Sequence, residues 1–509
     1  MTRLKYLASV ILSYSLLLCV LAASPDGLTV HTQQGDVAGT LVSPTVRQFL
    51  GVPYAIAQRW QAPTTPPARS ATFQATNFSD SCVQELSPSA VIFLQLIGAG
   101  NDITVPESEN CLSVNIWAPA VSRKQQTAVM LWVYGGSFIF GTSNLNYYNG
   151  QYIVRDNEDV TIVTFNYRTN IFGQPNAPQL VSSAKSQNFG ILDLDAAVQW
   201  VYDNIAAFGG DPNRITLFGQ SAGSGAVDAY TFAFPNDQRV KGVIEQSGTL
   251  AVEFNSSLSA IVSTAPATLN ATAWNTVANA VGCGSNATTA QFTCMQQVPF
   301  RMLENAVIST GAAFNPIVDG INIFADVQAR SQSGNFLHVP LLSGSTAQEY
   351  DIFIVGQELL ANGTVIPVLT EATSDALTLP AFTCPAGVAA VQRMNAGVPA
   401  WRYQYQAVFP DLSTRPELRA YHASDIPMVF GTYNLSEFPA PATPTEIALS
   451  KYMQQAWVAF ARNPQSGLLG FGWPMYNPLT ASLAQFGNVL NQTGTIMILG
   501  SLIDLLCPH

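Results

Sequence analysis

Charged side chains are scarce in this 509-residue chain. Asp, Glu, Lys and Arg make up 10% of the residues, against roughly 25% in ordinary soluble domains. The balance is acidic, with a formal net charge of −11, and no basic run is long enough to follow a phosphate backbone. A nucleic-acid partner is therefore not expected, because such binding depends on clustered Lys and Arg.

Histidine and paired cysteine motifs are also rare. The chain has four His residues and no Cys-x-x-Cys sequence, so it lacks the ligand spacing of the common zinc sites. No internal repeat, linker or low-complexity tract interrupts it. We therefore expect neither a metal nor an organic cofactor, and a single domain over residues 24–509.

Only one long apolar run is present, near the N-terminus. Arg3 and Lys5 precede the apolar residues 6–21, and the small residues Ala22 and Ala23 follow. This order is typical of a secretory signal peptide, so we expect residues 1–23 to be removed. A membrane anchor is the alternative, but the run is short for one. The mature chain is expected to be secreted and extracellular, without stable membrane insertion.

The remaining cysteines and the glycosylation sequons agree with secretion. An even number of cysteines in a secreted chain predicts three disulfides. Repeated Asn-x-Ser/Thr sequences predict surface glycans. The cysteines are Cys82, Cys111, Cys283, Cys294, Cys384 and Cys507, and the sequons begin at Asn77, Asn255, Asn270, Asn286, Asn362, Asn434 and Asn491.

Short apolar runs predict the strands of a central sheet. Residues 128–134 and 160–165 are continuous apolar runs, which is typical of strands buried on both faces. Helical spacing follows over 191–207, and further strand candidates lie at 215–218, 242–247, 339–343 and 400–407. Alternating buried strands and helices predict an α/β fold with a large, mostly parallel central sheet and helices on both faces. The alternating pattern of residues 28–50 predicts an N-terminal antiparallel extension.

One five-residue stretch organises the rest of the chain. Gly219-Gln220-Ser221-Ala222-Gly223 reads Gly-x-Ser-x-Gly between an apolar run and a run of small residues. A strand that turns sharply into a helix exposes the middle residue, and the flanking glycines avoid steric clashes. The hydroxyl of Ser221 would then lie near a helix N-terminus, which favours a developing negative charge. A serine in an ordinary glycine-rich loop is the alternative.

A serine nucleophile needs a base, and His422 is the strongest candidate. His31 lies in the first hairpin region, His509 is the last residue, and His338 precedes a strand. Sites in parallel sheets lie beyond the carboxyl ends of the strands. His422 follows a strand on a loop, so it occupies the expected edge.

The acid that orients this base is predicted to be Glu349. It lies just past the strand at 339–343, and the order serine, acid, histidine is that of an α/β-hydrolase. Asp351, Asp319 and Asp425 remain competitors on these grounds. Backbone N–H groups of Gly135-Gly136-Ser137, after a buried strand, together with that of Ala222, are candidates for an oxyanion hole.

With these motifs in place, the chain resembles the type-B carboxylesterase and lipase family, which includes fungal lipases, cholinesterases and the adhesion neuroligins. The stretches that carry the resemblance are 49–55, 108–112, 131–141, 166–168, 190–193, 208–223, 246–248 and 425–431. The resemblance implies an α/β-hydrolase fold, with Ser221 as nucleophile, Glu349 as acid and His422 as base. It implies Gly136, Ser137 and Ala222 as oxyanion donors and Ser247 as a hydroxyl behind the triad.

The resemblance also implies structural pairings. It implies the disulfides Cys82–Cys111 and Cys283–Cys294, which leaves Cys384–Cys507, and the buried ion pairs Arg59–Glu109 and Arg168–Asp193. Two departures from the family pattern concern the site. Gln220 replaces the usual glutamate before the nucleophile, which removes a negative charge beside the base and is expected to change the pH profile. Ser137 replaces a glycine in the oxyanion loop, which narrows the hole.

These features predict a serine carboxylic ester hydrolase that works through an acyl-enzyme intermediate. The segment 82–111 is a candidate lid, and its apolar centre favours small-molecule or lipid esters that are hydrophobic. Cholinesterase activity is disfavoured because this segment holds no Trp to bind a quaternary ammonium. The alternatives are an interfacial lipase or sterol esterase and, outside enzymes, a non-catalytic neuroligin-like binding protein.

Overall fold

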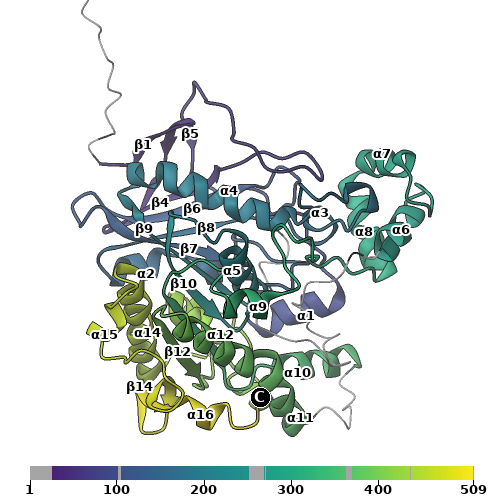
Figure 1. Cartoon of the computed structure of the whole chain (residues 1–509). Helices are drawn as coiled ribbons and strands as arrows, with labels where there is room; N and C mark the ends of the chain where they lie inside the picture. The colour runs from purple at the N-terminus through teal and green to yellow at the C-terminus, as the bar shows by residue number, and fades with distance from the viewer. Residues whose placement is uncertain are drawn as a thin grey trace, which may run out of the picture.

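The computed structural model describes residues 24, 26–100, 105–250, 269, 271–362, 370–435, 437–438 and 440–507. An 11-stranded sheet runs through the molecule, and its central strands are parallel (Figure 1). In spatial order its strands are β14 (Asn491–Leu499), β13 (Ala481–Asn488), β12 (Ala400–Tyr405), β11 (Leu341–Thr346), β10 (Val240–Gln246), β9 (Gly210–Gln220), β7 (Thr127–Val133), β8 (Val160–Phe165), β6 (Ser113–Pro119), β4 (Val46–Pro53) and β3 (Thr40–Ser43). This arrangement confirms the predicted α/β-hydrolase fold.

Antiparallel strands form both ends of this sheet. At the N-terminal end β3 pairs with β4 and β4 with β6, while β1 (Thr29–Thr32), β2 (Gly35–Ala38) and β5 (Phe73–Gln74) form a separate three-stranded sheet. The predicted N-terminal antiparallel extension is therefore present. At the other end β13 and β14 form an antiparallel hairpin. The sequence did not predict this hairpin, because its two strands lack a long apolar run.

Helices cover the sheet on opposite faces. Successive strand residues point to opposite faces, so two neighbours on β10 show which helix lies where. Gln246 accepts a hydrogen bond from the indole N–H of Trp457 on α14 (Pro444–Arg462). The charge of Asp228 on α5 (Ala222–Ala233) acts on Glu245, one residue earlier on β10. Helices α5 and α14 therefore sandwich the parallel strands, whose residues are almost wholly buried.

The remaining helices lie around this sandwich. On the sheet are α2 (Gln151–Asp156), α4 (Phe189–Asn204) and α12 (Cys384–Asn395). Helices α6 (Ala271–Ala280), α7 (Thr289–Gln297) and α8 (Phe300–Thr310) project to one side (Figure 1) and pack around an apolar cluster that also includes Trp60 and Phe172. The other α-helices of the described residues are α1 (Pro88–Leu96), α3 (Asn170–Gly173), α9 (Val327–Gln332), α10 (Asp351–Leu360), α11 (Glu371–Thr378), α13 (Ile426–Phe430), α15 (Gly467–Gly470) and α16 (Gly500–Ile503). A π-helical turn, η5 (Leu379–Thr383), joins α11 to α12.

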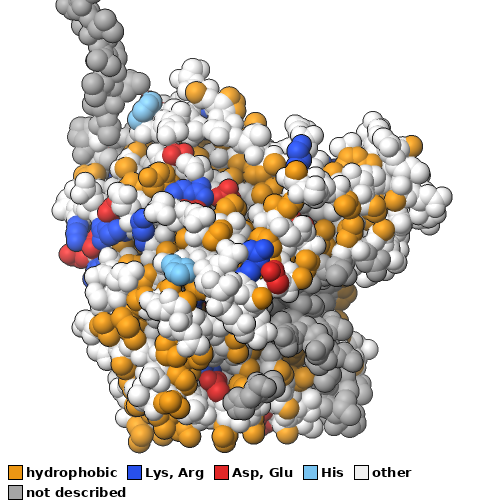
Figure 2. Space-filling view, viewed as in Figure 1, with side chains coloured by type: hydrophobic (Ala, Val, Ile, Leu, Met, Phe, Trp, Pro, Cys, Tyr) orange, Lys and Arg blue, Asp and Glu red, His pale blue; other side chains and the backbone are white. Residues whose placement is uncertain are grey.

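The surface reflects the low charge content. Figure 2 shows a face that is mostly uncharged, with Lys and Arg gathered in a few places among scattered apolar side chains. Within the described residues, no helix combines the length and apolar character needed to cross a membrane. The predicted signal peptide lies outside the described residues.

Candidate active site

Ser221 stands at a sharp turn between a strand and a helix. It follows β9 directly and precedes α5, with φ 57° and ψ −127°, and it is 5% exposed. A left-handed backbone is rare for a residue with a Cβ and stores strain. Glycines crowd the turn: a Cβ on Gly223 would lie 2.1 Å from the Val133 carbonyl oxygen, and one on Gly248 would lie 2.3 Å from that of Ser221. These contacts explain why the Gly-x-Ser-x-Gly sequence folds into this turn.

Glu349 and His422 meet at the carboxyl ends of the neighbouring strands. Oε2 of Glu349, three residues past β11, lies 2.5 Å from Nδ1 of His422, on the loop after β12. The other carboxylate oxygen accepts the backbone N–H of Thr346 at 2.7 Å. Both side chains are buried, at 0% and 1% exposure. The pair therefore has the geometry of a histidine whose ring is oriented by an acid.

The three competing acids are engaged elsewhere. Asp351 forms an ion pair with Arg419 at 2.7 Å, and Asp319 accepts from the Asn188 amide at 2.9 Å. Asp425 is buried near Glu349 and accepts hydrogen bonds from Tyr403 and Gln246. Burial and the nearby charge of Glu349 raise the pKa of Asp425 to about 6.

Two other histidines lie away from this site. His31 contacts Asp36 at 2.8 Å on the surface, and His338 contacts the Gly334 carbonyl at 2.9 Å. His509 lies outside the described residues. Among the histidines that the structure describes, His422 is thus the one that shares a cavity with Ser221.

The second ring nitrogen of His422 faces Gln220. The amide nitrogen of Gln220 lies 3.0 Å from Nε2 of His422. Within the described residues, no hydrogen bond joins the Ser221 hydroxyl to the imidazole. Hydrogen bonds of this kind are often long in the absence of substrate and tighten only when it binds.

Two elements next to Ser221 carry backbone N–H groups that are candidates for binding an oxyanion. After β7, Gly136 and Ser137 adopt φ 110° and 55°, and the Gly136 carbonyl accepts from Ile139 and Phe140 in a tight turn. Among the described residues, no group accepts a hydrogen bond from the N–H of Gly136 or Ser137. Ala222 supplies another N–H at the start of α5. Such unpaired donors are the physical requirement for binding a negatively charged oxygen.

A cavity of about 140 Å³ lies over Ser221 and His422. Its polar lining comes from the loop after β7, Gln220 and Ser89, and among the residues that the structure describes no Asp, Glu, Lys or Arg lines it. The apolar lining comprises Ala90, Phe93, Leu94, Ile97, Ile139, Phe140, Leu145, Phe353, Ala423 and Ile426, together with the ring of Tyr148.

Three phenylalanines surround the ring of His422. The ring centroids of Phe382 and Phe353 lie 4.9 and 5.3 Å from that of His422, and Phe93 lies at 6.5 Å. No pattern in the sequence predicts that these three rings lie around His422. Phe353 lies four residues after Glu349, so its closeness in sequence could have indicated that it lies near the site. Phe93 and Phe382 are far from His422 in sequence and reach it only through tertiary packing.

The candidate lid packs down over the cavity. Its helix α1 contacts α10, and Phe93 on α1 stacks against Phe353 with 6.0 Å between centroids. At its start the candidate lid is tied to the loop after β7, because the Glu85 N–H donates to the Ile139 carbonyl at 2.8 Å. Burial raises the pKa of Glu85 to about 7. Residues 101–104 of this segment lie outside the described residues.

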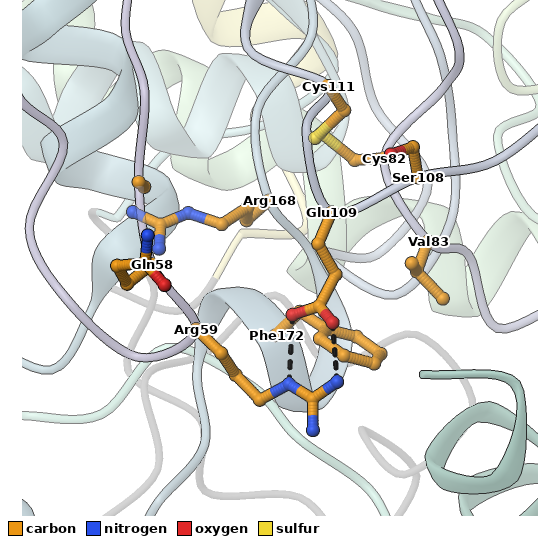
Figure 3. A pocket seen from close by; sticks show the side chains of 10 residues that line it. Gln58, Arg59, Cys82, Val83, Ser108, Glu109, Cys111, Arg168 and Phe172 are labelled. Atoms are coloured by element: carbon orange, nitrogen blue, oxygen red, sulfur yellow. Dashed lines mark hydrogen bonds and ion pairs between the residues drawn. A yellow bond between two sulfur atoms is a disulfide. The ribbon is translucent and has the colours of Figure 1, made fainter. Parts of the chain in front are cut away.

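The structure contains the expected disulfides and ion pairs. The disulfides are Cys82–Cys111, Cys283–Cys294 and Cys384–Cys507. Arg168 and Asp193 form a buried ion pair at 2.7 Å. Arg59 and Glu109 also pair, with Nε 2.9 Å from Oε2 (Figure 3). The prediction that this second pair is buried was wrong, because the Glu109 side chain is 31% exposed.

The pair between Arg59 and Glu109 borders a hollow of about 10 Å³ near Cys82–Cys111 (Figure 3). This volume is about that of one water molecule. The hollow is therefore too small for a ligand, and its charged groups hold the base of the lid.

Ser247 lies at the end of β10 with φ 55° and donates its N–H to Gly344. Its buried hydroxyl has no partner among the described residues.

Five sequon residues are exposed: Asn77, Asn286, Asn362, Asn434 and Asn491. Asn255 and Asn270 lie outside the described residues. In the described part of the chain, no three His, Cys, Asp or Glu side chains gather in a way that could hold a metal.

Comparisons with known proteins agree with this geometry. The model of the carboxylesterase family matches residues 26–362 and 364–495. A chlorogenic acid esterase of Aspergillus niger is 32% identical over 482 residues, covering 91% of this chain and 89% of that protein. Secreted lipase 5 of Gibberella zeae is 31% identical over 488 residues, covering 88% and 87%.

A solved structure of a PNB esterase superposes with a TM-score of 0.73 at 26% identity, covering 93% of this chain and 97% of the other. Sequence and fold thus agree over nearly the whole length. The chain belongs to the carboxylesterase family and is a carboxylic ester hydrolase.

Proposed function

We propose that the protein is a secreted serine hydrolase that cleaves hydrophobic carboxylic esters with the triad Ser221, His422 and Glu349. The observation that carries this proposal is the placement of Ser221 on a strained turn, in one cavity with a histidine that Glu349 holds by Nδ1. His422 takes the Ser221 proton as the hydroxyl attacks the ester carbonyl, and then returns it to the leaving alcohol. Water repeats the sequence and releases the acid.

The oxyanion of the tetrahedral intermediate is assigned to three backbone donors. Gly136 and Ser137 reach it from the loop after β7, and Ala222 reaches it from the N-terminus of α5. Fixed donors need no reorganisation when charge develops, and one of them is typically worth about 10²–10³ in kcat.

The substrate class follows from the cavity lining. A charged acyl or alcohol group would lose its hydration without gaining a partner, because none of the described residues that line the cavity carries a formal charge. Aromatic and aliphatic walls instead favour a neutral, hydrophobic ester.

The small volume of the cavity implies that α1 moves when a large substrate binds. The cavity holds about 140 Å³, whereas pockets for drug-sized ligands run to roughly 300–1,000 Å³. A long acyl chain therefore requires α1 and Phe93 to move away from Phe353. Such a movement would also expose apolar surface, and this supports the second candidate, a lipase that acts at an oil–water interface.

Secretion and glycosylation complete the proposal. Three disulfides suit an oxidising compartment, and residues 1–23 have the pattern of a signal peptide. One domain over residues 24–509 would then carry the site, with glycans on its exposed sequons.

The test is covalent labelling of the purified protein with an organophosphonate, read by intact mass and peptide mapping. We expect one adduct on Ser221 that is lost in Ser221→Ala and strongly slowed in His422→Ala and Glu349→Gln. A panel of p-nitrophenyl esters, chlorogenic acid and emulsified triacylglycerol then sets the substrate. Activity that rises sharply above substrate solubility would favour the lipase, and absence of any adduct on folded protein would refute the triad.

A further inference from the structure

Gln220 is confined between Gly135 and His422. It is the last residue of β9 and is 3% exposed. Its amide nitrogen lies 3.0 Å from Nε2 of His422. On the opposite side, its amide oxygen lies 3.0 Å from the point where a Cβ on residue 135 would stand. A glycine at 135 therefore leaves the space that the amide group occupies.

In the contact between Gln220 and His422, the donor and the acceptor can be assigned. An ionised Glu349 can only accept, so Nδ1 of His422 donates to it and carries a proton. In a neutral imidazole, Nε2 then offers a lone pair, and the Gln220 amide N–H donates to it. The same lone pair must take the proton of Ser221. The amide of Gln220 and the hydroxyl of Ser221 therefore compete for one atom.

Proton transfer to His422 exchanges the donor and the acceptor in this contact. When Ser221 Oγ bonds to the ester carbonyl carbon, the carbonyl electron pair moves to oxygen and the hydroxyl proton passes to Nε2 of His422. Both ring nitrogens are now donors, so an amide nitrogen at Nε2 has nothing to offer. A half-turn of the terminal torsion of Gln220, which is broad and roughly two-fold, presents the amide oxygen instead.

We propose that Gln220 is a positioning residue that holds His422 as a neutral base in the closed site and, by turning over its amide, stabilises the imidazolium formed during acyl transfer. This inference rests on the proposed triad. Its consequence is that the rate of acyl transfer depends on whether the side chain at position 220 can both donate to and accept from Nε2.

The other ionisable groups around His422 do not supply this effect. Glu349 and Asp425 are carboxyl groups, and as anions both favour a protonated ring. Tyr403 hydrogen-bonds to Asp425 rather than to the imidazole, and burial raises its pKa well above the usual range. Phe93, Phe353 and Phe382 carry no charge. Among the described residues, Gln220 is thus the donor placed on Nε2.

The experiment measures the rate of phosphonate labelling and kcat/KM for p-nitrophenyl acetate from pH 4 to 9. Gln220→Glu keeps the size of the side chain but only accepts when ionised, and Gln220→Met removes both donor and acceptor. Gln297→Glu changes the charge equally at an exposed position on α7 and is the control.

We expect Gln220→Glu to move the acid limb of both profiles upward by at least half a pH unit, and Gln220→Met to lower both rates at least several-fold without that upward movement. Gln297→Glu should superimpose on the wild type. Profiles of Gln220→Glu and Gln220→Met that coincide with the wild type would overturn the inference. If Gln220→Glu does not fold, Gln220→Met decides alone. A wild type that neither labels nor hydrolyses esters would instead refute the proposed triad.

Discussion

Replacing Gly223 by alanine tests how the turn at Ser221 is built. An added Cβ would lie 2.1 Å from the Val133 carbonyl oxygen and 2.5 Å from that of Tyr134. Both contacts are with backbone, at the end of β7 that leads into the oxyanion loop. Non-bonded atoms prefer separations of about 3.5 Å or more. Helix α5 and β7 must therefore separate by about 1 Å or more to admit the methyl group.

Such a shift affects stability and catalysis together. Overpacking a close contact costs about 1–3 kcal/mol in the free energy of unfolding. The separation also moves Ser221 relative to Gly136 and Ser137, and a misplacement of about 1 Å can cost about 10²-fold in rate. We therefore expect Gly223→Ala to fold with reduced stability and to lose roughly two orders of magnitude in kcat/KM.

Gly225 on the same helix provides the matched control. A Cβ on Gly225 would meet no atom within 4 Å, and alanine is favoured over glycine inside a helix by about 1 kcal/mol. Gly225→Ala should therefore keep full activity and equal or exceed wild-type stability. Urea unfolding and kcat/KM for p-nitrophenyl butyrate measure both effects. Equal behaviour of the two variants would refute the steric account of the turn.

Three further predictions concern the oxyanion loop, the lid and pH. Ser137 has φ 55°, so Ser137→Gly relieves backbone strain but loosens the loop. We expect turnover to change at least several-fold with little change in the free energy of unfolding. Unchanged turnover would contradict a role of Ser137 in shaping the oxyanion hole. Phe93→Ala removes the ring above His422, and the ratio of kcat/KM for p-nitrophenyl laurate over acetate should rise several-fold, which an unchanged ratio would contradict. The pKa of Asp425 is about 6, raised from 3.8; the folded state therefore holds this proton more tightly, and stability is lost as pH rises through about 6. The raised pKa corresponds to about 3 kcal/mol of unfolding free energy. We therefore expect the change in unfolding free energy between pH 4 and pH 8 to differ by about that amount between the wild type and Asp425→Asn. A difference under about 1 kcal/mol would contradict a raised pKa of the buried Asp425.

The central sheet was predictable because its strands are buried on both faces. Continuous apolar runs at 128–134 and 160–165 correspond to β7 and β8 within one residue. The hairpin of β13 and β14 was not predicted, since β14 is largely exposed and its residues carry no strong period. Helix α1 was missed for a different reason. Its sequence is apolar on all sides, so no helical period marks it, although Pro88 after the capping Ser87 is typical of a helix start.

The site was predictable where chemistry restricts the choice of residue. Only Ser221 lies in the Gly-x-Ser-x-Gly turn, and elimination among four histidines left His422. The contact between Gln220 and His422 was not predictable, because a side-chain rotamer depends on the space around it, here on Gly135. The ring of Phe382 reaches His422 from η5, which no local pattern places there.

Backbone strain around the site is the feature that sequence reveals least. Ser137, Ser221, Ser247 and Ala423 all have left-handed φ angles, although none is glycine. The sheet holds two of them in place: Ser221 donates its N–H to Gln246 on β10, and Ser247 donates to Gly344 on β11, both at 2.8 Å. Each residue is thus fixed to the end of the next strand, so relaxing one turn would break a buried hydrogen bond. The strain persists because the parallel strands determine it, and the same strands bring Ser221 to the edge where Glu349 and His422 lie.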